Sequence, residues 1–332
     1  MRRQRTHGRV TALFLTAGLL AACGGGDEEP SAPADQALSS DDPVSIRVGA
    51  LPVGDMAPLY LAVQEGFFED EGLDVEIQQI PGGAAGVPAM VSGELQFSSS
   101  NWVSVILAAS EGLDLQIVLE NSGNTTGVNA ILTGADSPLQ SVADLAGQSV
   151  AVNTLGGPTE IVVRECLRGN GLDPDEYSLV EIPFPDQGSA IAEGQIAAGL
   201  VAEPFVTLGT EQGQQTLVDT PTCTPRLEGW PLIGWAATAQ YTAENPEVAA
   251  AFARAMDQAI SFAADNPDAV NEIVQTFTSL TPELAERVVQ PGWLEETEPS
   301  LERAELTQDL MIDNGLLDEP VDDLESLIFT TD

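Results

Sequence analysis

The sequence contains no lysine, and its single histidine, His7, lies close to the N-terminal end. The absence of lysine excludes Schiff-base chemistry and a nucleotide-binding P-loop. Because no histidine follows residue 7, the rest of the chain also lacks Ser–His and Cys–His nucleophile pairs and histidine metal ligands. A carboxylate pair of the glycosidase type stays open, but no two acids stand out. We therefore expect a protein that is not an enzyme, with no catalytic residue, no metal site and no cofactor.

Positive charge is also scarce, with eleven arginines against 52 acidic residues. Four of these arginines precede residue 10, so seven serve the rest of the chain. Such an excess of acid keeps a protein soluble and argues against nucleic acid or an anionic membrane surface as a partner. Two explanations of the composition stay open: a salty medium, which screens acidic surfaces, and GC-rich coding, which removes lysine.

Residues 1–22 have the layout of a secretory signal. Arginines precede an apolar run at residues 10–20, and the segment from Leu20 to Cys23, LAAC, resembles the bacterial lipobox, whose cysteine is lipidated. We expect Cys23 to carry lipid and residues 23–43, rich in glycine, proline and acid, to form a flexible tether. A plain signal peptide or an N-terminal membrane anchor is the alternative, although the apolar run is short for a membrane span. The expected location is the outer face of the cytoplasmic membrane, at the cell surface or in the periplasm.

The part that follows the tether opens with an alternation of strands and a helix. Residues 45–80 predict a strand, a loop, a helix at residues 59–68 and a second strand from residue 73. A degenerate copy lies about one hundred residues later, where Pro58, Gly72, Pro81 and Gly93 have counterparts in Pro158, Gly171, Pro183 and Gly194. Four landmarks in one order at a nearly constant offset predict two lobes of similar βαβ construction. Helices are expected further on at residues 246–265, 267–277, 282–290 and 301–314, followed by an acidic tail.

Cysteine is rare as well, because only Cys166 and Cys223 follow Cys23. Cysteines of exported proteins most often pair, and the expected topology places these two in one lobe. A disulfide is therefore favoured over two buried free thiols.

Several short strings resemble the SsuA-like family, the solute-binding proteins of ABC importers for nitrate, sulfonate, taurine and thiamine-pyrimidine. The resemblance covers nearly all of the chain after residue 43, and its order and spacing are more specific than any single string. The strings are Ala57-Pro58-Leu59-Tyr60, Gly66-Phe67-Phe68, Glu71-Gly72-Leu73-Asp74-Val75, LAGQSVAV at residues 145–152, Ala202-Glu203-Pro204-Phe205, Asn245-Pro246-Glu247 and Asp265-Asn266-Pro267-Asp268.

The resemblance implies an α/β protein with the type II periplasmic-binding fold, in which two lobes joined by two hinge crossings close over a ligand cleft. Lobe 1 would hold residues 44–131 and 235–332, and lobe 2 residues 132–234. The implied function is a monomer that captures a small-molecule solute and delivers it to an ABC permease in the cytoplasmic membrane. The alternatives are a ligand sensor that serves no permease and a pyrimidine-synthase-like enzyme of the same fold, which the missing histidine disfavours.

Ligands in open α/β sheets bind at the carboxyl ends of the strands, so we expect the cleft at the loops 54–60, 82–86, 99–102, 153–159 and 202–205. The candidate ligand contacts are Asp55, Met56, Tyr60, Gly83, Asn101, Trp102, Asn153, Thr154, Gly156, Gly157, Thr159 and Glu203.

Each of the main candidates has a structural alternative. The Gly156-Gly157-Pro158 segment is either an anion site at a helix N-terminus or a tight turn. Trp102 and Tyr60 either stack on a flat ligand or pack in the core. Glu203 either accepts hydrogen bonds from a ligand amine or caps a neighbouring loop, and Asp55 is either a ligand contact or an exposed acid.

The charge of the ligand stays open at this point. The family leans towards anions, which the glycine-rich helix start suits. The acidic body, Glu203 and the few arginines favour a neutral or cationic heterocycle such as a thiamine-precursor pyrimidine.

Overall fold

The computed structural model describes residues 38–330. The expected signal peptide, the lipidation site Cys23 and most of the tether lie outside the described residues. Within the described range, no helix is long and apolar enough to cross a membrane.

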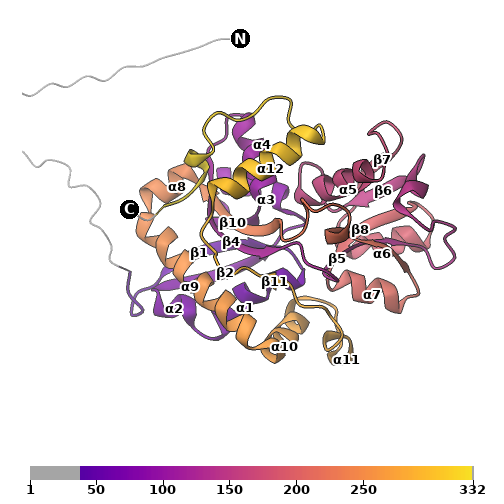
Figure 1. The fold of residues 1–332 in the computed structure, drawn as a ribbon. Helices are drawn as coiled ribbons and strands as arrows, with labels where there is room; N and C mark the ends of the chain where they lie inside the picture. Colours follow the sequence, from indigo (N-terminus) through magenta and orange to yellow (C-terminus); the bar gives the residue numbers. More distant parts are fainter. Residues whose placement is uncertain (1–37, 331–332) are drawn as a thin grey trace, which may run out of the picture. The chain divides into compact units, whose positions relative to one another are not determined.

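The first lobe is built on a six-stranded sheet, in the order β11-β4-β10-β3-β1-β2 (Figure 1). Strand β1 lies parallel to β2 and β3, whereas β10 is antiparallel to β3 and β4. The strands are β1 (Val44–Ala50), β2 (Leu73–Gln79), β3 (Phe97–Ser100), β4 (Leu115–Gly123), β10 (Pro231–Thr238) and β11 (Gly292–Trp293).

The second lobe repeats this arrangement on a five-stranded sheet, in the order β7-β6-β8-β5-β9. Strand β6 is parallel to β7 and β8, as β1 is to β2 and β3 in the first lobe, and β8 is antiparallel to β5, as β3 is to β10. The internal repeat is therefore visible in the strand pairing. The strands are β5 (Asn129–Thr133), β6 (Ser149–Val152), β7 (Ser178–Glu181), β8 (Ala198–Ala202) and β9 (Gln215–Asp219).

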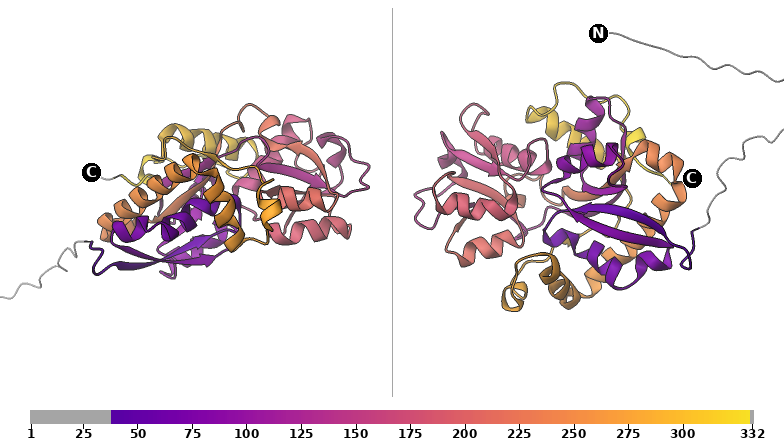
Figure 2. Two further views of the ribbon diagram at one scale, coloured as in Figure 1. Left: turned by 90° about the horizontal axis from the view of Figure 1, so that it is seen from below. Right: turned by 180° about the vertical axis from the view of Figure 1, so that it is seen from behind.

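Helices cover both faces of each sheet (Figures 1 and 2). In the first lobe, α1, α2 and α9 pack together on one face and α3, α4 and α12 on the other. The helices are α1 (Ala57–Gln64), α2 (Phe67–Asp70), α3 (Gly83–Val91), α4 (Trp102–Ser110), α5 (Pro158–Gly169), α6 (Phe184–Ala192), α7 (Phe205–Glu211), α8 (Ala239–Glu244), α9 (Pro246–Asp265), α10 (Pro267–Phe277), α11 (Pro282–Ala285) and α12 (Leu301–Asp313), with the 3-10 turns η1 (Gly54–Met56), η2 (Val142–Leu145), η3 (Thr220–Thr222) and η4 (Glu325–Leu327).

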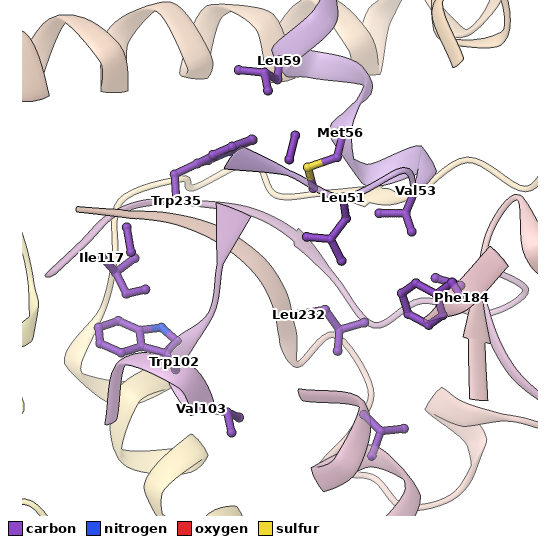
Figure 3. Packing of buried hydrophobic residues seen from close by; sticks show 14 of the residues in the cluster. Leu51, Val53, Met56, Leu59, Trp102, Val103, Ile117, Phe184, Leu232 and Trp235 are labelled. Atoms are coloured by element: carbon purple, nitrogen blue, oxygen red, sulfur yellow. The ribbon is translucent and has the colours of Figure 1, made fainter. Parts of the chain in front are cut away.

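Aromatic residues fix the long helix α9 to the first sheet. Phe252 of α9 stacks on Phe97 of β3 with the ring centroids 4.1 Å apart, and it also contacts Phe68 and Trp235. Trp235 is fully buried next to Leu59 and Met56, as Figure 3 shows. This core holds the first lobe together beneath the strand ends that carry the site.

The chain crosses between the lobes twice, at residues 124–128 and at residues 220–230. The crossings hydrogen-bond to each other, since Asn124 N–H donates to Trp230 O at 2.8 Å and Gly229 N–H donates to Asn124 O at 2.9 Å. The expected lobe boundaries, 131/132 and 234/235, fall inside β5 and β10 instead of in these crossings. Both strands are mostly apolar, so the sequence pattern gave no sign of where the chain changes sheet.

Three local expectations differ from the structure. The glycine-rich segment 82–86, expected as a loop, already belongs to α3 from Gly83 onwards. The single helix expected at residues 59–68 is divided into α1 and α2 at Glu65 and Gly66. The helix expected at residues 282–290 ends at Ala285.

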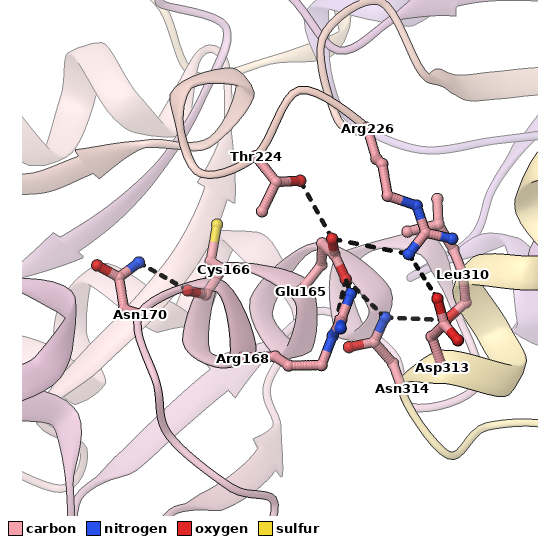
Figure 4. Close-up of polar contacts among 9 residues, drawn as sticks. All are labelled: Glu165, Cys166, Arg168, Asn170, Thr224, Arg226, Leu310, Asp313 and Asn314. Carbon is pink, nitrogen blue, oxygen red and sulfur yellow. Dashed lines mark hydrogen bonds and ion pairs between the residues drawn. The ribbon is translucent and has the colours of Figure 1, made fainter.

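A polar cluster ties the second lobe to the C-terminal end of α12 (Figure 4). The buried carboxylate of Glu165 on α5 accepts hydrogen bonds from Asn314 Nδ2 at 2.9 Å, Arg168 Nη2 at 2.6 Å and Thr224 Oγ1 at 3.2 Å. A disulfide joins the neighbouring Cys166 to Cys223, at the start of the second crossing. Helix α5, the crossing and α12 are thus joined around one carboxylate.

Candidate ligand-binding site

A cavity lies where the strand ends of the two lobes meet. Its open and enclosed parts together amount to about 520 Å³. The first lobe contributes Leu51, Val53, Asp55, Gly83, Ser99, Ser100, Asn101, Leu232 and Ile233, and the second lobe contributes Asn129, Asn153, Thr154, Pro158, Thr159, Phe184 and Ala202. The lining therefore combines an apolar wall with hydroxyls, amides and one carboxylate.

The two lobes contact each other around this cavity. Asn153 Nδ2 of the second lobe donates to Pro81 O of the first at 3.3 Å, and Gly54 N–H of the first donates to Glu203 O of the second at 3.0 Å. The loop at Gly82 comes so close to Thr154 that a Cβ atom on this glycine would lie 1.8 Å from the threonine Oγ1. Only a glycine fits this approach of one lobe to the other.

Among residues 38–330, Asp55 is the sole ionisable side chain that lines the cavity. It lies in the turn η1 after β1, is 4 % exposed, and accepts a hydrogen bond from Ser122 Oγ at 2.5 Å. Its backbone carbonyl accepts a hydrogen bond from Asn121 Nδ2 at 2.9 Å, so β4 holds the residue at two points. Burial raises the pKa of the Asp55 carboxyl, and the Ser122 hydrogen bond opposes this rise.

Three hydroxyls at the cavity have no hydrogen-bond partner within residues 38–330. They belong to Ser99 and Ser100 at the end of β3 and to Thr154 after β6. Buried polar atoms are nearly always hydrogen-bonded in proteins, so unpartnered hydroxyls on residues that line a cavity indicate partners supplied by a ligand or water. Asn101 adds an amide whose Oδ1 accepts the Ser104 N–H at 2.9 Å and thereby caps α4.

The expected anion site at the start of α5 is occupied by carboxylates of the chain itself. Gly156 N–H donates to Glu160 Oε2 at 2.8 Å, and Leu155 N–H donates to Glu181 Oε2 at 2.8 Å. Neither Gly156 nor Gly157 lines the cavity. Gly156 has a φ of 70°, which favours glycine and fits the alternative of a tight turn.

Six of the twelve candidate contacts line the cavity, namely Asp55, Gly83, Asn101, Asn153, Thr154 and Thr159. Asp55 is buried there, so the alternative of an exposed acid does not apply. Thr159 Oγ1 donates to Asn153 Oδ1 at 2.6 Å, which orients the Asn153 amide towards the first lobe.

The other candidates have structural roles. Met56 is completely buried in the core, and Tyr60 stacks on Phe277 with the ring centroids 4.0 Å apart. Trp102 is buried and donates from Nε1 to Glu120 Oε1 at 2.5 Å. Glu203 accepts hydrogen bonds from Thr207 N–H at 3.0 Å and Thr207 Oγ1 at 2.8 Å, so it caps the start of α7.

Sequence reasoning did not identify the apolar wall. Leu51, Val53, Leu232 and Ile233 from the first lobe and Phe184 from the second line the cavity, as does Asn129 of β5. Figure 3 shows that Leu51, Val53 and Leu232 lie near Phe184. Apolar residues at strand ends usually belong to the core, so the sequence offered no signal for this wall.

The two sheets, the double crossing and the cavity between the lobes define a two-lobed binding protein with the periplasmic-binding fold. A family model described as NMT1/THI5 like matches residues 54–270. The chain belongs to this family.

Similar proteins support this placement. The formylaminopyrimidine-binding protein of Halalkalibacterium halodurans is 27 % identical over 273 residues, which cover 81 % of this chain and 78 % of the relative. The riboflavin-binding protein RibY of Chloroflexus aurantiacus is 26 % identical over 255 residues, with 74 % and 70 % covered. Among solved structures, the alkanesulfonate-binding protein SsuA of Xanthomonas axonopodis pv. citri matches with a TM-score of 0.74 and 20 % identity, covering 86 % of this chain and 98 % of that one. The fold expected from the sequence is thus confirmed.

Proposed function

We propose that this protein is the solute-binding component of an ABC importer. The observation that carries the proposal is the cavity itself, because both lobes line it and three of its hydroxyls lack partners. A solute that hydrogen-bonds to groups of both lobes stabilises their approach to each other, which is how hinged binding proteins respond to ligand.

The cross-lobe contacts give this response a structural basis. A solute bound at Ser99 and Ser100 of the first lobe and at Thr154 of the second adds to the hydrogen bond between Asn153 and Pro81. The closed form then presents a defined surface to a permease in the cytoplasmic membrane, and release of the solute accompanies reopening.

The proposal includes export of the chain, a lipid on Cys23 and a monomeric solute-binding body that catalyses no reaction. Metabolic labelling with a radioactive fatty acid tests the anchor. The wild type should incorporate label and a Cys23→Ser variant should not. Equal labelling of both proteins would contradict lipidation at this residue.

A thermal-shift screen of the purified chain against small solutes of all charges tests the binding function. A ligand that binds only the native state raises the melting temperature by mass action. The bound protein should then stimulate ATP hydrolysis by its permease in membrane vesicles. If no solute shifts the melting temperature, the proposal fails; binding without stimulation of a permease would indicate a sensor instead.

A further inference from the structure

The names of the similar proteins span heterocycles and an alkanesulfonate, so they leave the charge of this protein's ligand open. From the cavity we infer that the ligand carries no negative charge and donates an N–H hydrogen bond to Asp55, as an amine or amidine group on a partly apolar body does. The inference rests on the proposed solute-binding function and names the chemistry of the site.

The charges around the cavity support this class. The Asp55 carboxylate is the one ionisable group in the lining, and within the described residues no donor from another residue reaches its second oxygen. A buried carboxylate repels an anion strongly because little solvent screens the pair. The same carboxylate attracts a group that carries N–H donors.

In the part of the chain that the structure describes, no cation is placed to offset this repulsion. Within residues 38–330, none of the seven arginines lines the cavity, six of them form ion pairs with carboxylates of the chain, and Arg47 donates to the Gly93 carbonyl at 3.1 Å. The pairs are Arg164–Glu160, Arg168–Glu165, Arg226–Asp313, Arg254–Glu71, Arg287–Glu211 and Arg303–Glu120. An anionic ligand would therefore find no free guanidinium.

Two backbone donors close to the start of α5 are also committed. The N–H groups of Leu155 and Gly156 at the start of α5 already bind Glu181 and Glu160. The side-chain donors left at the cavity include the Asn101 Nδ2 amide and the hydroxyls of Ser99, Ser100 and Thr154, which accept hydrogen bonds as readily as they donate them. Such groups suit an uncharged or cationic polar ligand.

The apolar wall completes the ligand class. Leu51, Val53, Leu232, Ile233 and Phe184 bury the non-polar part of a ligand, whereas Asp55 and the hydroxyls receive its polar edge. An inorganic anion such as nitrate has no apolar part to place against this wall.

Titration calorimetry with two panels of probes tests the inference on the purified full-length chain. One panel holds 4-aminopyrimidine, cytosine and benzamidine, and the other holds nitrate, ethanesulfonate and propanesulfonate. We expect binding of at least one member of the first panel and of none of the second. Binding of an anion in place of the amines overturns the ligand class but leaves the solute-binding function intact, and failure of every probe, followed by failure of a broad solute library, overturns both.

The variant Asp55→Asn tests the role of the carboxylate directly. The amide retains an oxygen for Ser122 but removes the charge, so the affinity for the bound amine should fall about 10- to 150-fold, as expected for a hydrogen bond to a charged group. Asp136→Asn, in an exposed loop of the second lobe, is the matched control and should bind like the wild type. Melting curves of both variants establish that they fold. An unchanged affinity in Asp55→Asn would refute the contact.

Discussion

A methyl group at Gly82 should keep the lobes apart and weaken ligand binding without damaging either lobe. The backbone there is extended, with φ −178°, so alanine adopts it without strain. The new Cβ would lie 1.8 Å from Thr154 Oγ1, 3.0 Å from Thr154 Cβ and 3.0 Å from Asn153 Nδ2. Rotation of the threonine side chain relieves the first contact only, so the loops must move apart.

The size of the effect follows from this overlap. Overpacking by one methyl in a close-packed region costs about 1–3 kcal/mol. Because the methyl affects only the form in which the lobes meet, this cost lowers the fraction of binding-competent protein and reduces the affinity by the same factor, about 5- to 150-fold. The free energy of unfolding of the open protein should not change, since no contact within a lobe is lost.

Calorimetric titration with the ligand found by screening measures the affinity, and small-angle X-ray scattering measures the compaction on binding. Gly134→Ala is the matched control, because its Cβ would lie 3.9 Å from the nearest atom, an ordinary contact within the second lobe. The double variant Gly82→Ala/Thr154→Ala should regain part of the compaction. If Gly82→Ala binds and compacts like Gly134→Ala, the reasoning is refuted, because the ligand-bound protein would then not use this contact.

Three further predictions concern stability. At neutral pH the ligand-free Asp55→Asn variant should melt no lower than the wild type, because burial raises the pKa of this carboxyl and its ionised form destabilises the fold. The difference in melting temperature between variant and wild type should shrink as the pH falls towards the ordinary pKa of 3.8. A lower melting temperature of the variant at pH 7 would contradict this prediction. Burial tends to raise the pKa of Glu165, but hydrogen bonds from Asn314 and Arg168 and the charges of Arg168 and Arg226 outweigh burial and lower the pKa. The substitution Glu165→Gln should therefore lower the free energy of unfolding, measured in urea at neutral pH, by about 2 kcal/mol. That loss should fade as the pH falls below the ordinary value of 4.5, and a pH-independent loss would disprove the linkage. Reduction of the disulfide, whose cysteines are 57 residues apart, should lower the free energy of unfolding by about 4 kcal/mol on the chain-entropy model, whereas unchanged urea curves with and without reductant would contradict it.

Much of the fold could be predicted because its signals are local. Proline at the first turn marks the starts of α9 and α10, and the expected ranges of both helices agree with the structure. The repeat was visible in glycines that the backbone requires, since Gly72, Gly171, Gly93 and Gly194 all have a φ between 68° and 83°. A glycine that ends a helix with positive φ keeps its place in both copies even where the side chains around it differ.

The lobe boundaries could not be predicted in the same way. Residues 130–133 and 232–237 have sequences typical of strands, and they lie within β5 and β10, but a strand's sequence does not say which sheet it joins. The choice depends on pairing between segments far apart in the chain, such as β5 with β8 and β10 with β4. The hydrogen bonds between the two crossings, which fix the hinge, are also long-range.

The candidate site was predicted best where a residue's role depends on its position at a strand end. Asn101, Asn153 and Thr154 follow β3 and β6 directly, and all three line the cavity. Residue type alone was a poor guide to ligand contacts where large or charged side chains have partners elsewhere in the fold. Tyr60 stacks on Phe277, Trp102 donates a hydrogen bond to Glu120, and Glu203 accepts one from Thr207. Of these partners, only Thr207 is close in sequence to the residue that it contacts.

The charge of the ligand has to be inferred from the groups at the site and not from the composition of the whole chain. A large excess of acid over arginine does not by itself exclude an anionic ligand, because one free guanidinium at a buried site outweighs many screened surface charges. The decisive fact is how the few cations are used. Arg164 is paired with Glu160, and Glu160 in turn accepts the Gly156 N–H, so one carboxylate takes up both a guanidinium and a helix-terminal donor that an anion would need. In a chain with no lysine, each such pairing removes a means of holding an anion, and Asp55 is left as the charge that the ligand meets.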